Sequence, residues 1–210
     1  MQLKLYHYWR SSSSWRVRWA FAIKKMPCAF VAVDLLKGEQ KGDAHLKRNP
    51  SGHVPVLEVE DGGKTFFLTE SLAIIEWMEE IQKEPSLLPG NSFQRARIRA
   101  LSEIVNSGTQ PVQNLKVQKF HSSDPEKQKE WTRHWIREGL SAYENLVKET
   151  AGKFSVGDTV TMADLFLIPQ CYNAKRFDVP LSEFSTIARI DAAAFQTSEC
   201  QASAPDKFQP

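Results

Sequence analysis

Strand patterns occur only in the first third of this chain, and that restriction constrains its fold more than any other feature. Leu3 to Tyr8 alternates apolar and polar residues, Ala29 to Val33 is a short apolar run, and two further runs, 54–59 and 65–68, flank Asp61-Gly62-Gly63. The first pattern is typical of a half-buried strand, and the glycine pair between the last two runs predicts a hairpin.

Two helical patterns accompany these strands. Residues 15–25 carry large apolar side chains on two rows and follow a serine run, which predicts a buried helix that begins at a serine cap. From Ser71, the residues Ile74, Met78 and Ile81 recur at helical spacing. Residues 1–81 are therefore predicted to form a small mixed α/β domain, in the order β-α-β-(α)-β-β-α.

The segment 82–91 contains two prolines and a glycine, which is typical of a linker between domains. Beyond it, the strand patterns disappear and helical patterns take their place. We predict an all-helical second domain over 92–210, with a polar tail from Ala202 that lies loosely on the surface. Its expected helices cover residues 93–120, 126–150, 161–176 and 181–197.

Composition narrows the functional classes. The 210 residues are 41% hydrophobic and 25% charged, with a net charge of +2, which favours a globular protein and offers no basic surface for nucleic acid. No apolar run is long enough to span a membrane. The three cysteines are widely spaced and the histidines lack ligand spacing, so we expect neither a disulfide framework nor a metal site. Unpaired thiols suit a reducing, cytoplasmic location.

The step from the first strand into the first helix is the most informative place in the sequence. Four consecutive serines, Ser11 to Ser14, stand there, and the N-terminus of a helix favours anions and thiolates. No glycine-rich nucleotide motif and no G-x-S-x-G element is present. Either a serine only caps the helix, or its hydroxyl donates to the sulfur of a bound thiol cofactor. Lowering a thiol pKa from about 8.5 by two units requires about 2.7 kcal/mol, which one or two charge-assisted hydrogen bonds supply.

Two further places in the first domain suit a small peptide ligand. Val54-Pro55 opens a strand, where Val54 can present its backbone to an extended ligand if the peptide bond is cis; a plain trans proline is the alternative. Glu70-Ser71 opens a helix, where Ser71 and its neighbouring amides can hold a carboxylate while Glu70 pairs with an ammonium group. Otherwise Ser71 is only a helix cap. A γ-glutamyl group carries both of those charges.

The segment Tyr8-Trp9-Arg10-Ser11-Ser12-Ser13-Ser14-Trp15-Arg16-Val17-Arg18 resembles the SSCSWRVR signature of the zeta-class glutathione transferases, a family that includes maleylacetoacetate isomerases. Matches continue in order along nearly the whole chain. They comprise Asn49-Pro50 to Val54-Pro55, Glu70 to Glu76, Leu87-Leu88-Pro89, Gln110 to Leu115, Val156-Gly157-Asp158, Thr161 to Leu165 and Asn173 to Phe177.

The resemblance implies a thioredoxin-like N-terminal domain, a helical C-terminal domain and a homodimer. It also implies glutathione-dependent cis–trans isomerisation of maleyl compounds, such as maleylacetoacetate to fumarylacetoacetate in aromatic amino-acid catabolism. By resemblance, Ser11 or Ser12 activates the glutathione thiol, with Ser11 preferred because it aligns with the first signature serine. The residues implied to hold the tripeptide are Ser11, Ser12, Trp15, Arg16, Gln40, Val54, Glu70, Ser71, Gln110 and Asn114.

Departures from the family pattern leave the substrate open. Ser13, included among the catalytic candidates, replaces the signature cysteine, which the maleylpyruvate isomerase branch also lacks. A dianionic substrate requires cations, for which Arg10 and Arg176 are our candidates. The alternatives are a maleylpyruvate isomerase, a general glutathione transferase or peroxidase, and a non-catalytic glutathione-binding module. Paired arginines favour an isomerase over a transferase of neutral electrophiles.

A capping-box pattern, Thr161-x-x-Asp164, precedes an apolar run. We interpret it as the structural start of a buried helix, outside the active site.

Overall fold

The computed structural model describes residues 1–210, and the chain divides into two compact units. The first comprises Met1–Ser86 together with Ser198–Pro210, and the second comprises Leu87–Thr197. The division before Leu87 falls within the predicted linker. The assignment of Ser198–Pro210 to the first unit differs from the predicted domain of 92–210, and we refer to this stretch as the return segment.

The first unit is built on a four-stranded sheet in the order β2-β1-β3-β4. β1 pairs with β2 in parallel, whereas β3 is antiparallel to both β1 and β4. This is the thioredoxin-like arrangement that the family resemblance implies. Its elements are β1 (Gln2–His7), α1 (Ser12–Lys24), β2 (Ala29–Ala32), η1 (Glu39–Lys41), α2 (Asp43–Leu46), β3 (Val56–Asp61), β4 (Lys64–Thr69) and α3 (Ser71–Ile81).

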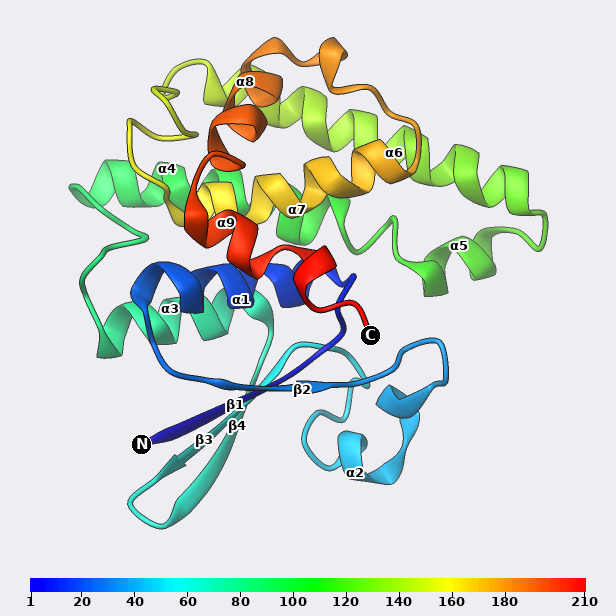
Figure 1. Ribbon diagram of the computed structural model, residues 1–210. Helices are drawn as coiled ribbons and strands as arrows, with labels where there is room; N and C mark the ends of the chain where they lie inside the picture. Colours follow the sequence, from blue (N-terminus) through cyan, green and yellow to red (C-terminus); the bar gives the residue numbers. More distant parts are fainter. The chain divides into compact units, whose positions relative to one another are not determined.

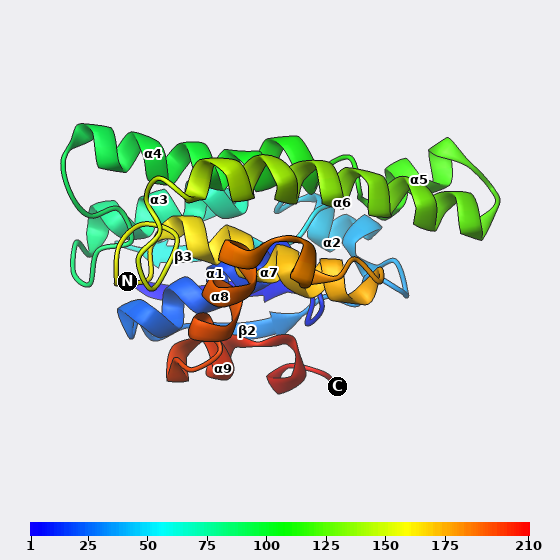
Figure 2. The ribbon, with the colours of Figure 1, turned by 90° about the horizontal axis from the view of Figure 1, so that it is seen from above.

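Helices α1 and α3 lie side by side on one face of this sheet and run in the same direction (Figures 1 and 2). Trp15 and Trp19 of α1 and Ile74 and Met78 of α3 are almost completely buried. Because α1 follows β1 and α3 follows β4 through short connections, both helices begin at the edge of the sheet where β1 ends. This edge carries the serine turn, Ser11–Ser14.

The return segment packs against α1, so the prediction of a loose polar tail is wrong. It contains α9 (Ser198–Ser203) and a 3-10 helix, η4 (Pro205–Lys207). Ser203 is 1% exposed, and its hydroxyl accepts a hydrogen bond from Trp15 Nε1 at 3.1 Å. The apolar rows of α1 are therefore covered on two sides, by the sheet and by α9, which explains why nearly the whole helix is buried.

The second unit is all-helical, as predicted. α7 is its central element, with almost every residue buried. Figure 2 shows α4 and α6 along one side of α7 and α8 on the other. The elements are α4 (Ser92–Glu103), η2 (Ile104–Thr109), α5 (Leu115–His121), α6 (Pro125–Val147), α7 (Met162–Arg176), η3 (Leu181–Glu183) and α8 (Ser185–Ala194).

The single helix expected over 93–120 is interrupted. After α4 the chain widens into one π-helical stretch, η2, and then leaves the helix at Gln110–Asn114. The cause is a close approach to α6, where a Cβ atom at Gly139 would come within 1.9 Å of Thr109 Oγ1. The Thr109 hydroxyl donates instead to the carbonyl of Ile104 at 2.8 Å. Pro111 then has no N–H with which to continue the helix.

None of the helices combines the length and the apolar character needed to cross a lipid bilayer.

Candidate functional site

The serine turn forms the start of α1. Ser11 is the N-cap, and its hydroxyl oxygen accepts from the backbone N–H of Ser14 at 3.2 Å. The Ser14 hydroxyl in turn accepts from the backbone N–H of Tyr8 at 3.3 Å. The first turn of α1 contains no acidic residue, so no side chain of that turn neutralises its partial positive charge. Ser11 and Ser13 are half-buried and Ser12 is 9% exposed.

The start of α3 is joined to α1 by a buried hydrogen bond. Arg16 Nη1 donates to the Ser71 hydroxyl at 3.1 Å, and both side chains are nearly inaccessible to solvent. Because the Ser71 oxygen accepts from a guanidinium group, its own proton is available to a third group. α3 also lacks an acidic residue in its first turn. Glu70, at φ 64° immediately before it, is exposed.

Val54 and Gln40 border the same end of the first unit. Val54 packs with Tyr8 in an apolar cluster, and the Val54–Pro55 peptide bond is cis. Val54 precedes the first ladder pair, Tyr6 with Val56, so its backbone groups lie outside the sheet. The Gln40 Oε1 atom is buried without a hydrogen-bond partner, which is the state expected of an amide that binds a polar ligand.

Trp15 and Arg16, for which the resemblance implies a role in holding the tripeptide, are almost completely buried. Trp15 is 1% exposed, and its only polar side-chain atom donates to Ser203. Arg16 is equally buried and reaches Ser71. Through these bonds Trp15 connects α1 to the return segment, and Arg16 connects α1 to the start of α3.

The remaining candidates belong to the second unit. Asn114 caps α5, with its side-chain oxygen accepting from the backbone N–H of Lys116 at 3.1 Å, and Gln110 follows η2. Arg176 is exposed at the end of α7, where Nη1 lies 3.4 Å from Asn173 Oδ1.

A glutamine pair that no sequence pattern indicates holds the 110–114 segment against α7. Gln113 and Gln170 exchange two buried amide hydrogen bonds of 2.7 and 2.9 Å.

Arg10, proposed for the substrate, is half-buried next to the serine turn. Its guanidinium group lies over the Trp9 ring at 5.3 Å from the ring centroid and is paired with no carboxylate. A cation in that state can take a carboxylate from a ligand without breaking an internal ion pair. Arg18, eight residues further along, is in contrast fully buried and was not singled out by sequence.

Comparison with known proteins identifies the family. Residues 1–80 match the N-terminal domain of glutathione S-transferases, and residues 110–189 match a C-terminal domain of the same proteins. The chain is 44% identical over 192 residues to the maleylacetoacetate isomerase of Dictyostelium discoideum, covering 89% of this chain and 86% of that protein. The chain belongs to the zeta-class glutathione transferases. Its fold is therefore the glutathione transferase fold, with a thioredoxin-like first domain.

Solved structures agree with this assignment. Maleylacetoacetate isomerase from Anaeromyxobacter dehalogenans, with glutathione bound in its active site, is 50% identical with a TM-score of 0.92, covering 100% of this chain and 97% of that one. Another structure of that protein holds dicarboxyethyl glutathione and citrate. A bacterial zeta-class maleylpyruvate isomerase is 38% identical with a TM-score of 0.91, covering 99% of this chain and 98% of that one.

Proposed function

We propose that this zeta-class transferase is a glutathione-dependent isomerase that converts maleylacetoacetate to fumarylacetoacetate, a step in the breakdown of aromatic amino acids. The observation that carries the proposal is the start of α1, where Ser11 stands at a helix end with no internal acid. Bound glutathione supplies a thiolate nucleophile that adds to the cis double bond and is released after rotation about the resulting single bond. The relatives named above support the choice of reaction.

Ser11 is the residue that we assign to thiolate stabilisation. Its oxygen already accepts from Ser14, so its proton is directed away from the backbone and toward a ligand. A hydrogen bond to a charged acceptor contributes about 1.5–3 kcal/mol, and the helix end adds about 0.3–1 kcal/mol. Together these terms lower a thiol pKa by about two units, which makes the thiolate the main form at neutral pH. Ser12 is the alternative donor.

The tripeptide fits the polar groups of the first unit. Ser71, oriented by Arg16, offers its hydroxyl proton and the first amides of α3 to a carboxylate, and Glu70 offers a carboxylate to an ammonium group. The backbone of Val54 lies outside the sheet, and the unpaired amide oxygen of Gln40 can accept from a peptide N–H. Gln110 and Asn114 are further proposed contacts, carried by the second unit.

Arg10 and Arg176 are the proposed partners of the substrate carboxylates. The dicarboxyethyl glutathione and citrate bound by the Anaeromyxobacter protein support a site of this class for carboxylate groups near the thiol. The Arg10 guanidinium lies over the Trp9 ring and is paired with no carboxylate, and Arg176 is exposed at the end of α7. Two cations match the two negative charges of the substrate.

Maleylpyruvate is the alternative substrate. It is favoured by the likeness to the zeta-class maleylpyruvate isomerase and by Ser13, which stands at the position of the signature cysteine. The two substrates share the maleyl group and differ in the group attached to it, so the same reaction serves both.

We further propose a homodimer in the cytoplasm. β4 is the outer strand of the sheet, and Phe66 and Phe67 on it are 51% and 41% exposed. Exposed aromatic side chains on a free sheet edge are unusual for a monomer and suit an interface. The three cysteines form no disulfide, which suits a reducing compartment. Sedimentation of the purified protein at micromolar concentration tests the dimer.

The decisive experiment offers maleylacetoacetate and maleylpyruvate separately, with and without glutathione, and follows the absorbance of each. We expect isomerisation of maleylacetoacetate only when glutathione is present. Faster turnover of maleylpyruvate would reverse the order of the two substrates. Isomerisation of neither substrate would overturn the proposal.

A further inference from the structure

Arg18 is a buried cation with no acidic partner. Its side chain is 1% exposed, and its guanidinium donates to main-chain carbonyls from two distant parts of the sequence. Nη2 donates to the carbonyl of Trp9 at 3.0 Å, Nη1 to that of Tyr8 at 3.4 Å, and Nε to that of Ser203 at 3.0 Å. Nη1 also lies 3.2 Å from His7 Nδ1. We call Arg18 and these four partners the Arg18 network.

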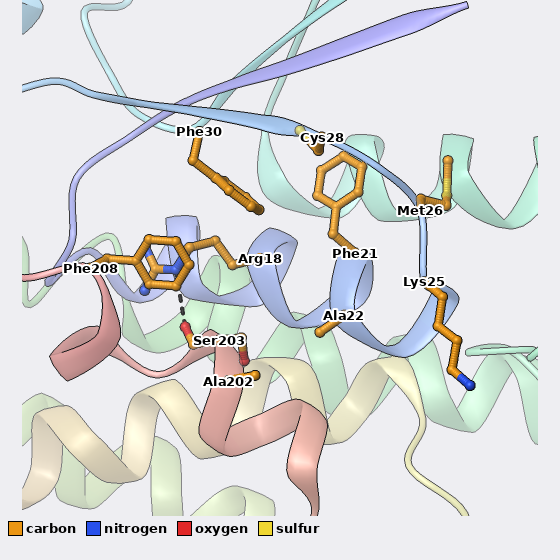
Figure 3. Close-up of a pocket in the computed structure, with 10 residues that line it drawn as sticks. All are labelled: Arg18, Phe21, Ala22, Lys25, Met26, Cys28, Phe30, Ala202, Ser203 and Phe208. Atoms are coloured by element: carbon orange, nitrogen blue, oxygen red, sulfur yellow. Dashed lines mark hydrogen bonds between the residues drawn. The ribbon is translucent and has the colours of Figure 1, made fainter.

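The return segment completes this network. In Figure 3 the guanidinium of Arg18 lies between the Ser203 carbonyl and the ring of Phe208. The Phe208 ring centroid is 4.5 Å from the guanidinium carbon, and the same ring packs edge-on against His7 and Phe30. The Phe208 ring thus covers the guanidinium and shields its charge from water, while the Ser203 carbonyl holds the group in place through a hydrogen bond.

At neutral pH the Arg18 network contains a charged guanidinium and a neutral imidazole, that of His7. Burial lowers the pKa of Arg18 to about 9, so the guanidinium remains protonated. Burial and the charge of Arg18 lower the pKa of His7 to about 4, so the imidazole is neutral and its Nδ1 can accept from Arg18. A neutral acceptor and three carbonyls solvate the cation in place of water.

The network acts on the backbone that precedes the serine turn. The Tyr8 carbonyl accepts from Arg18 and also from the backbone N–H of Ser11 at 3.1 Å, while the Tyr8 N–H donates to the Ser14 hydroxyl. Tyr8 is therefore held by Arg18 on one side and by the serine turn on the other. A displacement of Tyr8 changes the direction in which the Ser11 hydroxyl points.

We propose that Arg18 is the positioning residue of the thiolate site and that the return segment, through Ser203 and Phe208, holds Arg18 in place. This inference rests on the proposed function for the identity of the thiol, and it adds a role for residues that touch neither glutathione nor substrate. A lysine cannot take over this role. A guanidinium presents donors in several directions of one plane and so reaches the carbonyls of Tyr8, Trp9 and Ser203 together, whereas an ammonium group is a single compact donor.

Arg18→Met is the main test, and Lys25→Met is its matched control. Lys25 is the C-cap residue directly after α1 and lines the same pocket as Arg18, but it is exposed and makes no contact with the turn (Figure 3). Without ligand, hydrogen exchange of the Ser11 and Ser14 amides is measured. With glutathione bound, the pKa of its thiol is obtained from the ultraviolet absorbance of the thiolate as the pH is varied.

In Arg18→Met we expect amide exchange at Ser11 and Ser14 to be at least about tenfold faster, and the pKa of the bound thiol to rise by about one unit. Turnover falls about tenfold, while KM for the maleyl substrate changes by less than about twofold. In Lys25→Met the amide exchange rates, the pKa of the bound thiol and the turnover are the same as in the unmodified protein. Arg18→Lys gives values close to those of Arg18→Met.

Phe208→Leu keeps every hydrogen bond of Arg18 and removes only the ring, so it carries the test if Arg18→Met does not fold. We expect amide exchange at Ser11 and Ser14 to become about threefold faster and turnover to fall about threefold, with a correspondingly smaller rise in the pKa of the bound thiol. A variant that lowers the melting temperature but leaves the exchange of Ser11 and the bound thiol pKa unchanged would show that the network is merely structural. Failure of the unmodified protein to isomerise maleyl substrates would overturn the proposed function, while the exchange and thiol measurements would still decide the role of Arg18.

Discussion

Helices α1 and α7 each have a hydroxyl residue as the N-cap, Ser11 and Thr161, and they differ in what neutralises their N-terminal ends. At α7, Asp164 lies in the first turn and is completely buried, and its carboxylate accepts from the Thr161 N–H at 2.8 Å, the Thr161 hydroxyl at 3.0 Å and the Ser155 N–H at 2.8 Å. At α1, Ser11 caps the helix and no acidic residue follows. One end contains its own anion, and the other does not.

The difference separates a structural start from a binding site built on the same principle. Free N–H groups at a helix end favour negative charge wherever it comes from. At α7 the charge comes from the chain, is enclosed by it and contributes to folding. At α1 a ligand can supply the negative charge, because Ser11 and Ser13 at this helix end are only half-buried and leave the N-terminus of the helix accessible. The capping box predicted at Thr161–Asp164 is present.

Removing the internal anion has the largest expected effect. Asp164→Ala leaves the backbone N–H groups of Thr161 and Ser155 buried without acceptors, at about 1–3 kcal/mol each, so we expect a loss of roughly 4 kcal/mol in the free energy of unfolding. Chemical denaturation measures this loss. Turnover per folded molecule stays near that of the unmodified protein, and a selective loss of turnover would place α7 in the active site.

Ser11→Ala tests the other end of the comparison. We expect turnover to fall by about a hundredfold to a thousandfold, because the substitution removes the donor to the thiolate, while glutathione binding measured by calorimetry changes little. Stability falls by about 1 kcal/mol through loss of the cap. Ser12→Ala is the matched variant. If Ser12→Ala loses turnover and Ser11→Ala loses only stability, Ser11 is a cap like Thr161 and Ser12 is the donor.

The pH dependence of stability also distinguishes the two regions, because the contributions of His7 and Asp164 to the free energy of unfolding change in opposite directions with pH. The folded pKa of His7, about 4, lies below its usual 6.5, so unfolding takes up a proton and stability falls as the pH decreases from 6.5 toward 4. Burial raises the pKa of Asp164 above its usual value, so the contribution of this carboxyl group to the free energy of unfolding is lost as the pH rises through the raised pKa. In His7→Asn we expect roughly 3 kcal/mol less acid destabilisation between pH 6.5 and 4. Equal slopes in the two proteins would contradict a neutral His7.

Thr161→Ala has the smallest expected effect. It removes one hydroxyl donor from Asp164 but keeps both backbone donors, so stability falls by about 0.5–2 kcal/mol and turnover does not change. The midpoint of denaturation and the rate under saturating substrate check the two statements together. An unchanged midpoint with collapsed turnover would reverse our interpretation of this helix.

Much of the fold follows from local patterns. The alternation in β1, the glycine turn between β3 and β4, and the spacing of Ile74 and Met78 in α3 are all properties of neighbouring residues. The break at η2 is different, because it depends on the contact of Thr109 with Gly139 on another helix. No local pattern in 93–120 specifies that contact, so the run was predicted as one helix.

The candidate site divides in the same way. The serine turn and Glu70-Ser71 are recognisable because a polar residue before an apolar run marks a helix start. The roles of Trp15 and Arg18 depend on Ser203, which is 188 and 185 residues away, so nothing near them in sequence distinguishes a supporting residue from a binding one. The available indication is that Arg16 and Arg18 are charged residues within an otherwise apolar helix.

The return segment also has a consequence for biosynthesis. A ribosome makes α1 before the second unit and α9 after it. Domains that are contiguous can fold as they emerge, one after the other. Here the partner of Trp15 is residue 203, so the first unit acquires its complete set of contacts only after the second has been synthesised. The serine turn is thus translated before the second unit, but the contacts that support it are complete only after that unit has been made.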